Sequence, residues 1–347
     1  MKTIDPYSLF ERAEKKRFSS HFKEAIALYK KAITAAKKIK DPEAELISLL
    51  ALGGSVRITG NFKEAVKVYS KAVALAKQLK LKEEEVDATV GIGLCNRAQG
   101  EHIGAIKNFN KAITFYSSTK DRTGLAFTLW SRAGAKRIKG DAKGAVTDFK
   151  AAKKIFTALN DLPGIGYCLT GLGGSSRVLG RTHLTEKYYN EANVLLRDLK
   201  DAFGISYSYC GIGNAFRMRG DFKNALKFFN KAERGYAKIG DIVSYAYTCW
   251  ARGTTYQLLG ESALARKDFK RAEKLFKKTG DLRGLTYCKL SEAQAMAVKG
   301  KNKEALLIAS QAEKDAKKGG FGIELRYAKE VRKAIKSDVN KLPLNLP

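Results

Sequence analysis

Residues 52–72 read LGGSVRITGNFKEAVKVYSKA. Gly60 stands near the middle, and an alanine, a tyrosine and a second alanine follow it at spacings of five, four and three residues. Spacings of four and three place side chains on one face of an α-helix, and glycine readily takes the positive φ with which helices end. The stretch therefore predicts two helices, over residues 42–59 and 62–79, joined by a tight turn.

The same pattern returns every 40 residues along the chain, without insertions. The glycine of the turn stands at Gly60, Gly100, Gly140, Gly180, Gly220, Gly260 and Gly300. The second alanine stands at Ala32, Ala72, Ala112, Ala152, Ala192, Ala232, Ala272 and Ala312. An aspartate suited to cap the first helix of each repeat recurs at Asp41, Asp121, Asp161, Asp201, Asp241 and Asp281. Such a period predicts a solenoid in which each repeat packs on its neighbours.

We expect this solenoid to form one domain over residues 1–337. Its repeats run over about 2–40, 41–80, 81–120, 121–160, 161–200, 201–240, 241–280 and 281–319, and a last helix over 320–337 caps the end. The remaining residues, 338–347, contain two prolines and are expected to form a flexible tail. Whether this tail instead fills the groove of the solenoid stays open at this point.

These columns resemble the tetratricopeptide repeat family over nearly the whole chain. The resemblance also rests on a Leu-Gly or Ile-Gly pair in the first helix, found at Leu52-Gly53, Ile92-Gly93, Leu172-Gly173 and Ile212-Gly213. The period is longer than the family's usual value of about 34 residues and is similar to the variety found in Partner-of-Inscuteable-type scaffolds and some bacterial regulators. The resemblance implies an all-α fold, a right-handed superhelical solenoid of about eight helix-turn-helix repeats plus a C-terminal capping helix. It also implies that the first helices line an inner groove.

The composition narrows the class of protein. The chain has 347 residues and a formal net charge of 65 − 35 = +30, and 44% of its residues are hydrophobic, which excludes general disorder. No apolar run reaches the roughly 18 residues of a membrane-spanning helix, and the N-terminus does not resemble a secretory signal. Five cysteines without a paired spacing indicate free thiols in a reducing compartment. We therefore expect a soluble, cytoplasmic protein that attracts anionic partners.

One face of the first helices carries an aromatic column. Its members are Tyr7, Ile47, Asp87, Phe127, Tyr167, Tyr207, Tyr247, Tyr287 and Tyr327. Two interpretations stay open: the rings pack between repeats, or they form an amphipathic contact surface, for which tyrosine is well suited.

Small residues stand beside this column, at Ala51, Gly91, Ser131, Gly171, Gly211 and Ala251. Glycine in mid-helix costs about 1 kcal/mol relative to alanine. Its repeated use indicates close approach by a neighbouring helix or by a ligand, and the helix is the favoured cause.

An arginine column follows ten residues after the aromatic one, at Arg17, Arg57, Arg97, Arg137, Arg177 and Arg217. These side chains either bind helix-end carbonyls and carboxylates within the fold or form a basic row that holds carboxylates or phosphates through paired donors. Arg132 and Arg252 replace apolar residues of the packing face and either reach outwards or pair internally.

The aromatic and arginine columns coincide best in the middle repeats. The residues predicted to bind the partner are Phe127, Trp130, Arg137, Tyr167, Arg177, Tyr207, Asn214, Arg217, Tyr247 and Trp250. No paired acids, no nucleophile beside a base and no cluster with metal-ligand spacing occur in the sequence. We therefore predict that the protein is not an enzyme and has no cofactor or metal.

The function predicted from these features is that of a scaffold or adaptor. Its groove would recognise an acidic protein partner, such as a peptide, a tail or a filament surface. Binding of RNA, with arginines on phosphates and rings on bases, is one alternative. Docking on an anionic membrane surface is another, and self-association through the solenoid ends is also compatible with the sequence.

Overall fold

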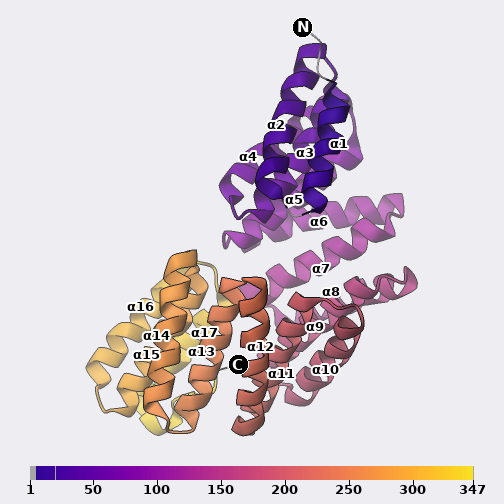
Figure 1. Cartoon of the computed structure of the whole chain (residues 1–347). Helices are drawn as coiled ribbons and strands as arrows, with labels where there is room; N and C mark the ends of the chain where they lie inside the picture. Colours follow the sequence, from indigo (N-terminus) through magenta and orange to yellow (C-terminus); the bar gives the residue numbers. More distant parts are fainter. Residues whose placement is uncertain (1–4, 20, 347) are drawn as a thin grey trace. The chain divides into compact units, whose positions relative to one another are not determined.

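A computed structural model describes residues 5–19 and 21–346 (Figure 1). Within these residues the chain forms seventeen α-helices and one short 3-10 helix, Val339–Lys341, and it contains no strand. Consecutive helices pack in pairs within each of the two units described below. The prediction of an all-α fold built from eight helical pairs and a capping helix is confirmed.

Two sets of helices alternate along the chain. The first helices of the repeats are α1 (Pro6–Phe18), α3 (Pro42–Ile58), α5 (Lys82–Ala98), α7 (Arg122–Lys139), α9 (Leu162–Val178), α11 (Ala202–Met218), α13 (Ile242–Leu258) and α15 (Leu282–Val298), and α17 (Gly322–Ser337) is the capping helix. The second helices are α2 (Phe22–Ile39), α4 (Phe62–Leu79), α6 (His102–Thr119), α8 (Ala142–Ala158), α10 (Thr182–Asp198), α12 (Phe222–Ile239), α14 (Ser262–Thr279) and α16 (Asn302–Lys318).

The helix ends lie where the repeat columns place them. The side chain of Asp41 accepts a hydrogen bond from the backbone N–H of Ala44, at 2.9 Å, and so caps α3. Asn61 caps α4 through the backbone N–H of Glu64. Gly60, between the two helices, has a φ of +84°, which glycine takes without strain. Both helices of this repeat begin and end within one residue of their predicted bounds.

The chain divides into two compact units, residues 1–132 and 133–347, with the boundary inside α7. The core of the first unit gathers apolar side chains of α1 to α5. The core of the second unit runs from α8 to the residues after α17. The repeat columns do not mark this boundary, and a single domain over residues 1–337 stays a prediction.

The ring of Tyr69 in α4 explains the glycines of the neighbouring first helices. A Cβ atom on Gly53 of α3 would lie 2.7 Å from Cε1 of this ring, and a Cβ atom on Gly91 of α5 would overlap the same ring. In the second unit, Tyr189 of α10 meets Gly211 of α11 in the same way. We call this arrangement a ring slot. The glycines of the small column are thus explained by close approach within the fold, and the approaching group is a side chain of a second helix.

Two adjacent glycines of α3 should respond to alanine with opposite signs. Gly53→Ala places a methyl group 2.7 Å from the Tyr69 ring, and the cost of overpacking should exceed the gain in helix propensity, for a net loss of about 1 kcal/mol in the free energy of unfolding. At Gly54 the nearest atom to a new Cβ is the Tyr69 hydroxyl, at 3.6 Å, so Gly54→Ala should gain up to about 1 kcal/mol. Urea unfolding, followed by circular dichroism, measures the free energy of unfolding of both variants. Equal responses would contradict the ring slot.

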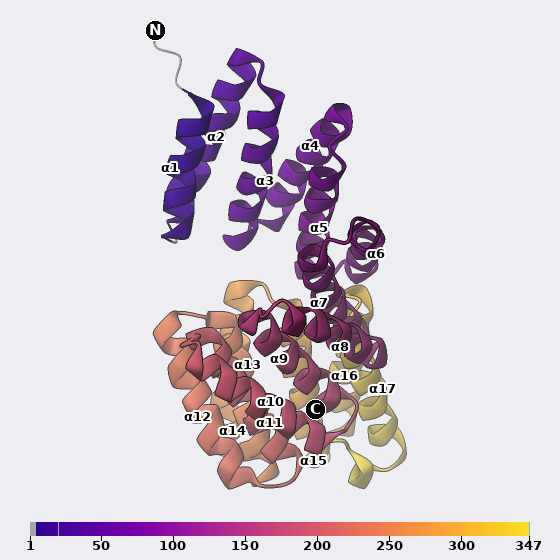
Figure 2. The ribbon, with the colours of Figure 1, turned by 90° about the vertical axis from the view of Figure 1, so that its right-hand side faces the viewer.

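The second unit brings the end of α7 against the start of α17. A Cβ atom on Gly322 would overlap the carbonyl oxygen of Lys139 and would lie 3.1 Å from the backbone nitrogen of Gly140. Two backbones that are far apart in the sequence therefore touch here, and only glycine leaves room for the contact. The helices of this unit, from α8 to α17, can be followed in Figure 2.

The residues after α17 correct one prediction. A flexible tail was expected over 338–347, but Leu342 and Leu346 are 8% and 2% exposed and belong to the core of the second unit. The side-chain amide of Asn345 donates to the backbone carbonyl of Arg217 at 3.2 Å. The prolines were the basis for expecting a frayed end, but the leucines beside them bury apolar surface against the second unit. Pro347 lies outside the described residues.

Candidate functional site

A pocket of about 250 Å³ lies in the second unit. Its lining residues are Arg137, Arg177, Tyr189, Tyr207, Cys210, Gly211, Asn214, Tyr236, Val243, Ser244, Tyr247, Trp250, Ala251, Arg283 and Tyr287. Six of the ten residues predicted to bind the partner are among them: Arg137, Arg177, Tyr207, Asn214, Tyr247 and Trp250. The structure thus brings these six together, while their contact with a partner stays a prediction.

Within the described residues, Arg137 and Arg177 of this pocket have no acidic partner. A Cβ atom on Gly174 of α9 would lie 2.6 Å from Nη1 of Arg137, so the missing side chain leaves room for this guanidinium. Burial, and then Tyr207, raise the pKa of Tyr189, and the charges of Arg177 and Arg137 oppose that rise. Both guanidinium groups are therefore close to one tyrosine. Among residues 5–19 and 21–346, no aspartate or glutamate forms an ion pair with either arginine.

Arg217 adjoins the pocket and is fully buried. Its Nη2 donates to Oδ1 of Asn214 at 3.0 Å and to the carbonyl oxygen of Leu346 at 2.8 Å, and its Nη1 donates to Oδ1 of Asn345. Burial, and then the charge of Arg177, lower the pKa of Arg217. All of these acceptors are neutral. Within the part of the chain that the structure describes, Arg217 is therefore a buried cation without a counterion.

Asn214 lines the pocket, and its side-chain oxygen accepts a hydrogen bond from Arg217. Its Nδ2 donates to the carbonyl oxygen of Cys210 at 2.9 Å, one turn earlier in α11, and this bond turns Oδ1 towards Arg217. The amide thus fixes the orientation of the guanidinium.

The arginine column has another role in the first unit. Arg17 donates to Glu14 at 2.9 Å. Arg97 donates to the carbonyl oxygen of Ser131 at 3.2 Å, and its guanidinium lies over the ring of Trp130. In these repeats the column makes contacts within the fold. For Arg17 and Arg97 the structural interpretation therefore holds, whereas for Arg137 and Arg177 a binding role stays a prediction.

Phe127 and Trp130 are not among the residues that line the pocket. Both belong to the part of α7 that is in the first unit. Their ring centroids are 5.9 Å apart, and Phe127 is 41% exposed. The two rings contact each other, and their binding of a partner stays a prediction.

Tyrosines of the aromatic column join neighbouring repeats, and two of them line the pocket. The hydroxyl of Tyr167 donates to Asp201 at 2.6 Å, and that of Tyr247 donates to Asp281 at 3.3 Å. Each of these aspartates caps the first helix of the following repeat, so these hydroxyls join neighbouring repeats. Tyr167 does not line the pocket, whereas Tyr207 and Tyr247 do.

The remaining pocket walls come from residues that were not predicted as site residues. Tyr189 and Tyr236 lie on second helices, where an aromatic residue indicates only a core. Arg283 forms an ion pair with the buried Glu324 at 2.8 Å, a partner that no repeat column indicates. Trp250 was predicted as a site residue. It lines the pocket as a buried side chain, and its indole N–H donates to Ser291 at 2.9 Å.

The two arginines of the packing face pair internally. Arg252 donates to both oxygens of Asp268, at 2.6 and 2.8 Å, and also to Glu233. Arg132 donates to Oδ1 of Asn110 at 2.7 Å. Internal pairing, one of the two alternatives, is therefore the one observed.

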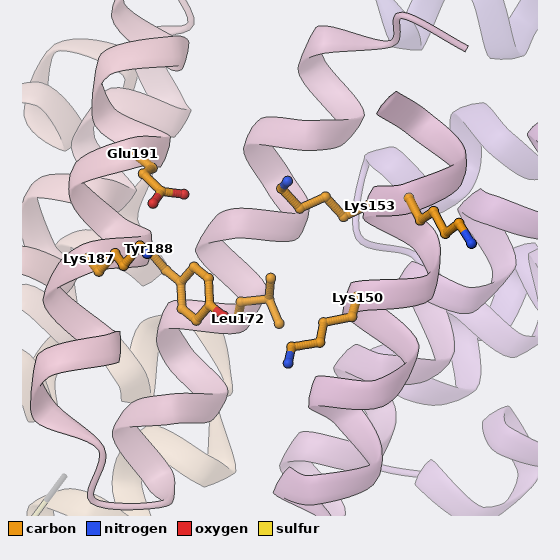
Figure 3. A pocket seen from close by; sticks show the side chains of 7 residues that line it. Lys150, Lys153, Leu172, Lys187, Tyr188 and Glu191 are labelled. Atoms are coloured by element: carbon orange, nitrogen blue, oxygen red, sulfur yellow. The ribbon is translucent and has the colours of Figure 1, made fainter. Parts of the chain in front are cut away.

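A separate cleft of about 330 Å³ lies between α8, α9 and α10 in the second unit. Figure 3 shows Lys150 and Lys153 on one side and Lys187 and Glu191 on the other. Lys154 also lines this cleft. One carboxylate among four lysines leaves a positive field that attracts anions without specific geometry.

The described residues contain no group of three or more histidine, cysteine, aspartate or glutamate side chains that could hold a metal ion. Of their helices, none combines the length and the apolar character needed to span a lipid bilayer.

No known protein family profile and no curated relative matches the chain. Solved structures do share its fold. A Rap protein complexed with Competence and Sporulation Factor is 15% identical, with a TM-score of 0.66, over 97% of this chain and 98% of that one. The Rap conjugation gene regulator of the plasmid pLS20, in complex with a Phr peptide, is 13% identical, with a TM-score of 0.53, over 88% and 98% of the two chains.

A tetratricopeptide repeat protein from Parabacteroides merdae is 18% identical, with a TM-score of 0.53, over 80% of this chain and 99% of that one. At such identities the likeness shows the fold alone. That fold is the one of tetratricopeptide repeat proteins, as the resemblance of the sequence implied.

Proposed function

We propose that the protein is a non-catalytic binding protein that holds an acidic peptide or protein segment in the pocket of its second unit. Carboxylates of the partner pair with Arg137 and Arg177, and its apolar side chains lie on Tyr207, Tyr247 and Trp250. The carrying observation is that no carboxylate of the described residues forms an ion pair with Arg137, Arg177 or Arg217.

Physical chemistry favours an anionic ligand at this place. A buried charge is costly unless an opposite charge or several hydrogen bonds compensate it. Guanidinium groups offer paired donors that match a carboxylate, and tyrosine rings beside them accept the apolar parts of a peptide. An acidic segment would therefore relieve the repulsion between Arg177 and Arg217.

Solved structures with this fold support a peptide ligand in a general way, since one of them contains a Phr peptide. Another is named an aspartyl phosphate phosphatase, from Bacillus subtilis, and is 12% identical to this chain. The fold therefore does not decide between binding and catalysis. The non-catalytic part of the proposal rests on the sequence, which has no recognisable catalytic group.

Replacement of the pocket arginines tests the proposal. The probe is a fluorescein-labelled peptide of alternating glutamate and leucine residues, and its binding is measured by fluorescence anisotropy. Arg177→Gln and Arg137→Gln should each weaken binding about tenfold or more, because each removes a charge-assisted hydrogen-bonded pair. Arg181→Gln is the matched control, since Arg181 is exposed and does not line the pocket.

The control separates local contact from overall charge. It removes one positive charge from the same unit, so it should change the affinity less than about twofold if only screened surface charge is lost. Equal losses in all three variants would reject the pocket as the binding site. Circular dichroism of each variant confirms that the helices remain.

RNA is the second candidate, and the lysine cleft of Figure 3 favours it. Labelled single-stranded RNA in the same assay should then bind with a steep salt dependence. This binding should fall when Lys150 and Lys153 are changed to glutamine and should survive Arg177→Gln. Anionic liposomes are the third probe, which covers the membrane alternative.

A further inference from the structure

Residues 342–346 lie against α11 and α15 of the second unit, and we call the surface that they cover the groove of this unit. Asn345 and Arg217 form hydrogen bonds in both directions: Nη1 of the arginine donates to the amide oxygen, and the amide nitrogen donates to the arginine's backbone carbonyl at 3.2 Å. The carbonyl oxygen of Leu346 accepts from Nη2 at 2.8 Å. Gln294 of α15 donates to the carbonyl oxygen of Pro343. The groove thus recognises both backbone and side chains of this segment.

The segment also fills apolar space. Leu342 and Leu346 are buried in the core of the second unit, and Leu344 packs partly against it. Arg217, beneath them, is 0% exposed, so no external molecule reaches its guanidinium while the segment is in place.

We infer that residues 342–346 are a releasable internal ligand of this groove, and that an external acidic segment pairs with Arg217 only after they have left. This inference rests on the proposed function for the identity of the competing partner. The site of the internal ligand does not depend on it.

The hydrogen bonds of the segment to Arg217 are ones that an acidic ligand can replace with stronger bonds. Every acceptor that the segment offers to Arg217 is a neutral oxygen. A carboxylate in the same place would form charge-assisted bonds, which are roughly twice as strong as neutral ones. The segment is attached to α17 through the short helix Val339–Lys341, whose last two residues are exposed, so release does not require α17 to unfold.

The test uses the full chain with changes in the segment. Asn345→Ala removes the amide that bonds Arg217, and Leu346→Ala removes a buried side chain. Both should strengthen binding of the labelled glutamate–leucine peptide by about fivefold or more, because the apparent affinity rises with the fraction of open groove. Asn340→Ala is the matched control: Asn340 is exposed on the same tail, and its side chain makes no hydrogen bond within the described residues. It should leave the affinity unchanged.

A second measurement tests the internal ligand without the acidic partner. A labelled peptide with the sequence of residues 338–347 is added to the Asn345→Ala, Leu346→Ala double variant, whose own segment is weakened. The peptide should bind, and Arg217→Met in the same background should abolish binding. Circular dichroism establishes that all variants keep their helices.

The outcomes distinguish the two proposals. If the acidic peptide binds all tail variants with the affinity of the unchanged chain, or the tail peptide fails to bind, the inference is wrong and the proposed function stands. If the tail peptide binds through Arg217 but no variant binds the acidic peptide, the internal ligand is supported and the proposed function is wrong.

Discussion

Replacing Asp268 with alanine is expected to lower the free energy of unfolding by about 3 kcal/mol. Asp268 on α14 accepts two hydrogen bonds from the largely buried guanidinium of Arg252, at 2.6 and 2.8 Å. The change leaves that cation with Glu233 and Asn230 alone, and a buried charge that loses a partner is strongly destabilising. The double change Asp268→Ala, Arg252→Met should lower the free energy of unfolding by less than the sum of the two single changes. It also removes the charge that Asp268→Ala leaves unpaired. Urea unfolding of the unchanged protein, the two single variants and the double variant measures these free energies.

Glu273→Ala is the control on the same helix. Glu273 pairs with Lys277 at 2.5 Å, but the two side chains are 43% and 65% exposed. An exposed pair of this kind contributes about 0.5 kcal/mol or less. A loss from Asp268→Ala that is no larger than this would show that the pairs of Arg252 do not support the fold.

The second large effect is expected at Gly322, where the start of α17 touches the end of α7. Gly322→Ala puts a methyl group onto the carbonyl oxygen of Lys139. A backbone oxygen cannot turn away as a side chain does, so one of the two helix ends must move. We expect a loss of about 2 kcal/mol in the free energy of unfolding. Amide hydrogen exchange in the first turns of α17 should become faster.

Gly104→Ala is the control for a glycine in the first turn of a helix. A Cβ atom there would have the side-chain nitrogen of Asn96 at 3.3 Å as its nearest neighbour, and this flexible amide can shift. The change should be neutral or should gain up to about 1 kcal/mol through helix propensity. If Gly322→Ala behaves in the same way and exchange in α17 is unchanged, the two helix ends are not in tight contact.

The helices were predictable because their positions depend on contacts within one repeat. The cap at Asp41 and the left-handed glycine at Gly60 act over a few residues, and a period of 40 residues repeats that information along the chain. The contact at Gly322 was not predictable, because it depends on how far the whole second unit curves. No residue near Gly322 indicates Lys139 as its neighbour.

The site was predictable in part for the same reason. A column states which residues share a face, and it correctly grouped Arg137, Arg177 and Tyr207 in one pocket. The column does not indicate which of its arginines contacts another part of the chain. Arg17 has a carboxylate one turn earlier in its own helix, whereas Arg217 meets a segment that lies more than a hundred residues further along the chain.

The tail was mispredicted because prolines in a terminal segment indicate fraying, whereas the free energy of docking comes from Leu342 and Leu346 and from the groove they enter. Those contacts join residues that are far apart in the sequence. A local pattern cannot contain them.

The ring slots bear on how a chain of this kind can change its length. Each ring belongs to one repeat and at least one of its small neighbours belongs to the next, as in Tyr69 with Gly91, Phe149 with Gly171 and Tyr189 with Gly211. Recombination between equivalent positions of two repeats would remove or add 40 residues and would still join a ring to a small residue. These three junctions share one design, so unequal recombination between them would lengthen or shorten the stack without a new kind of interface.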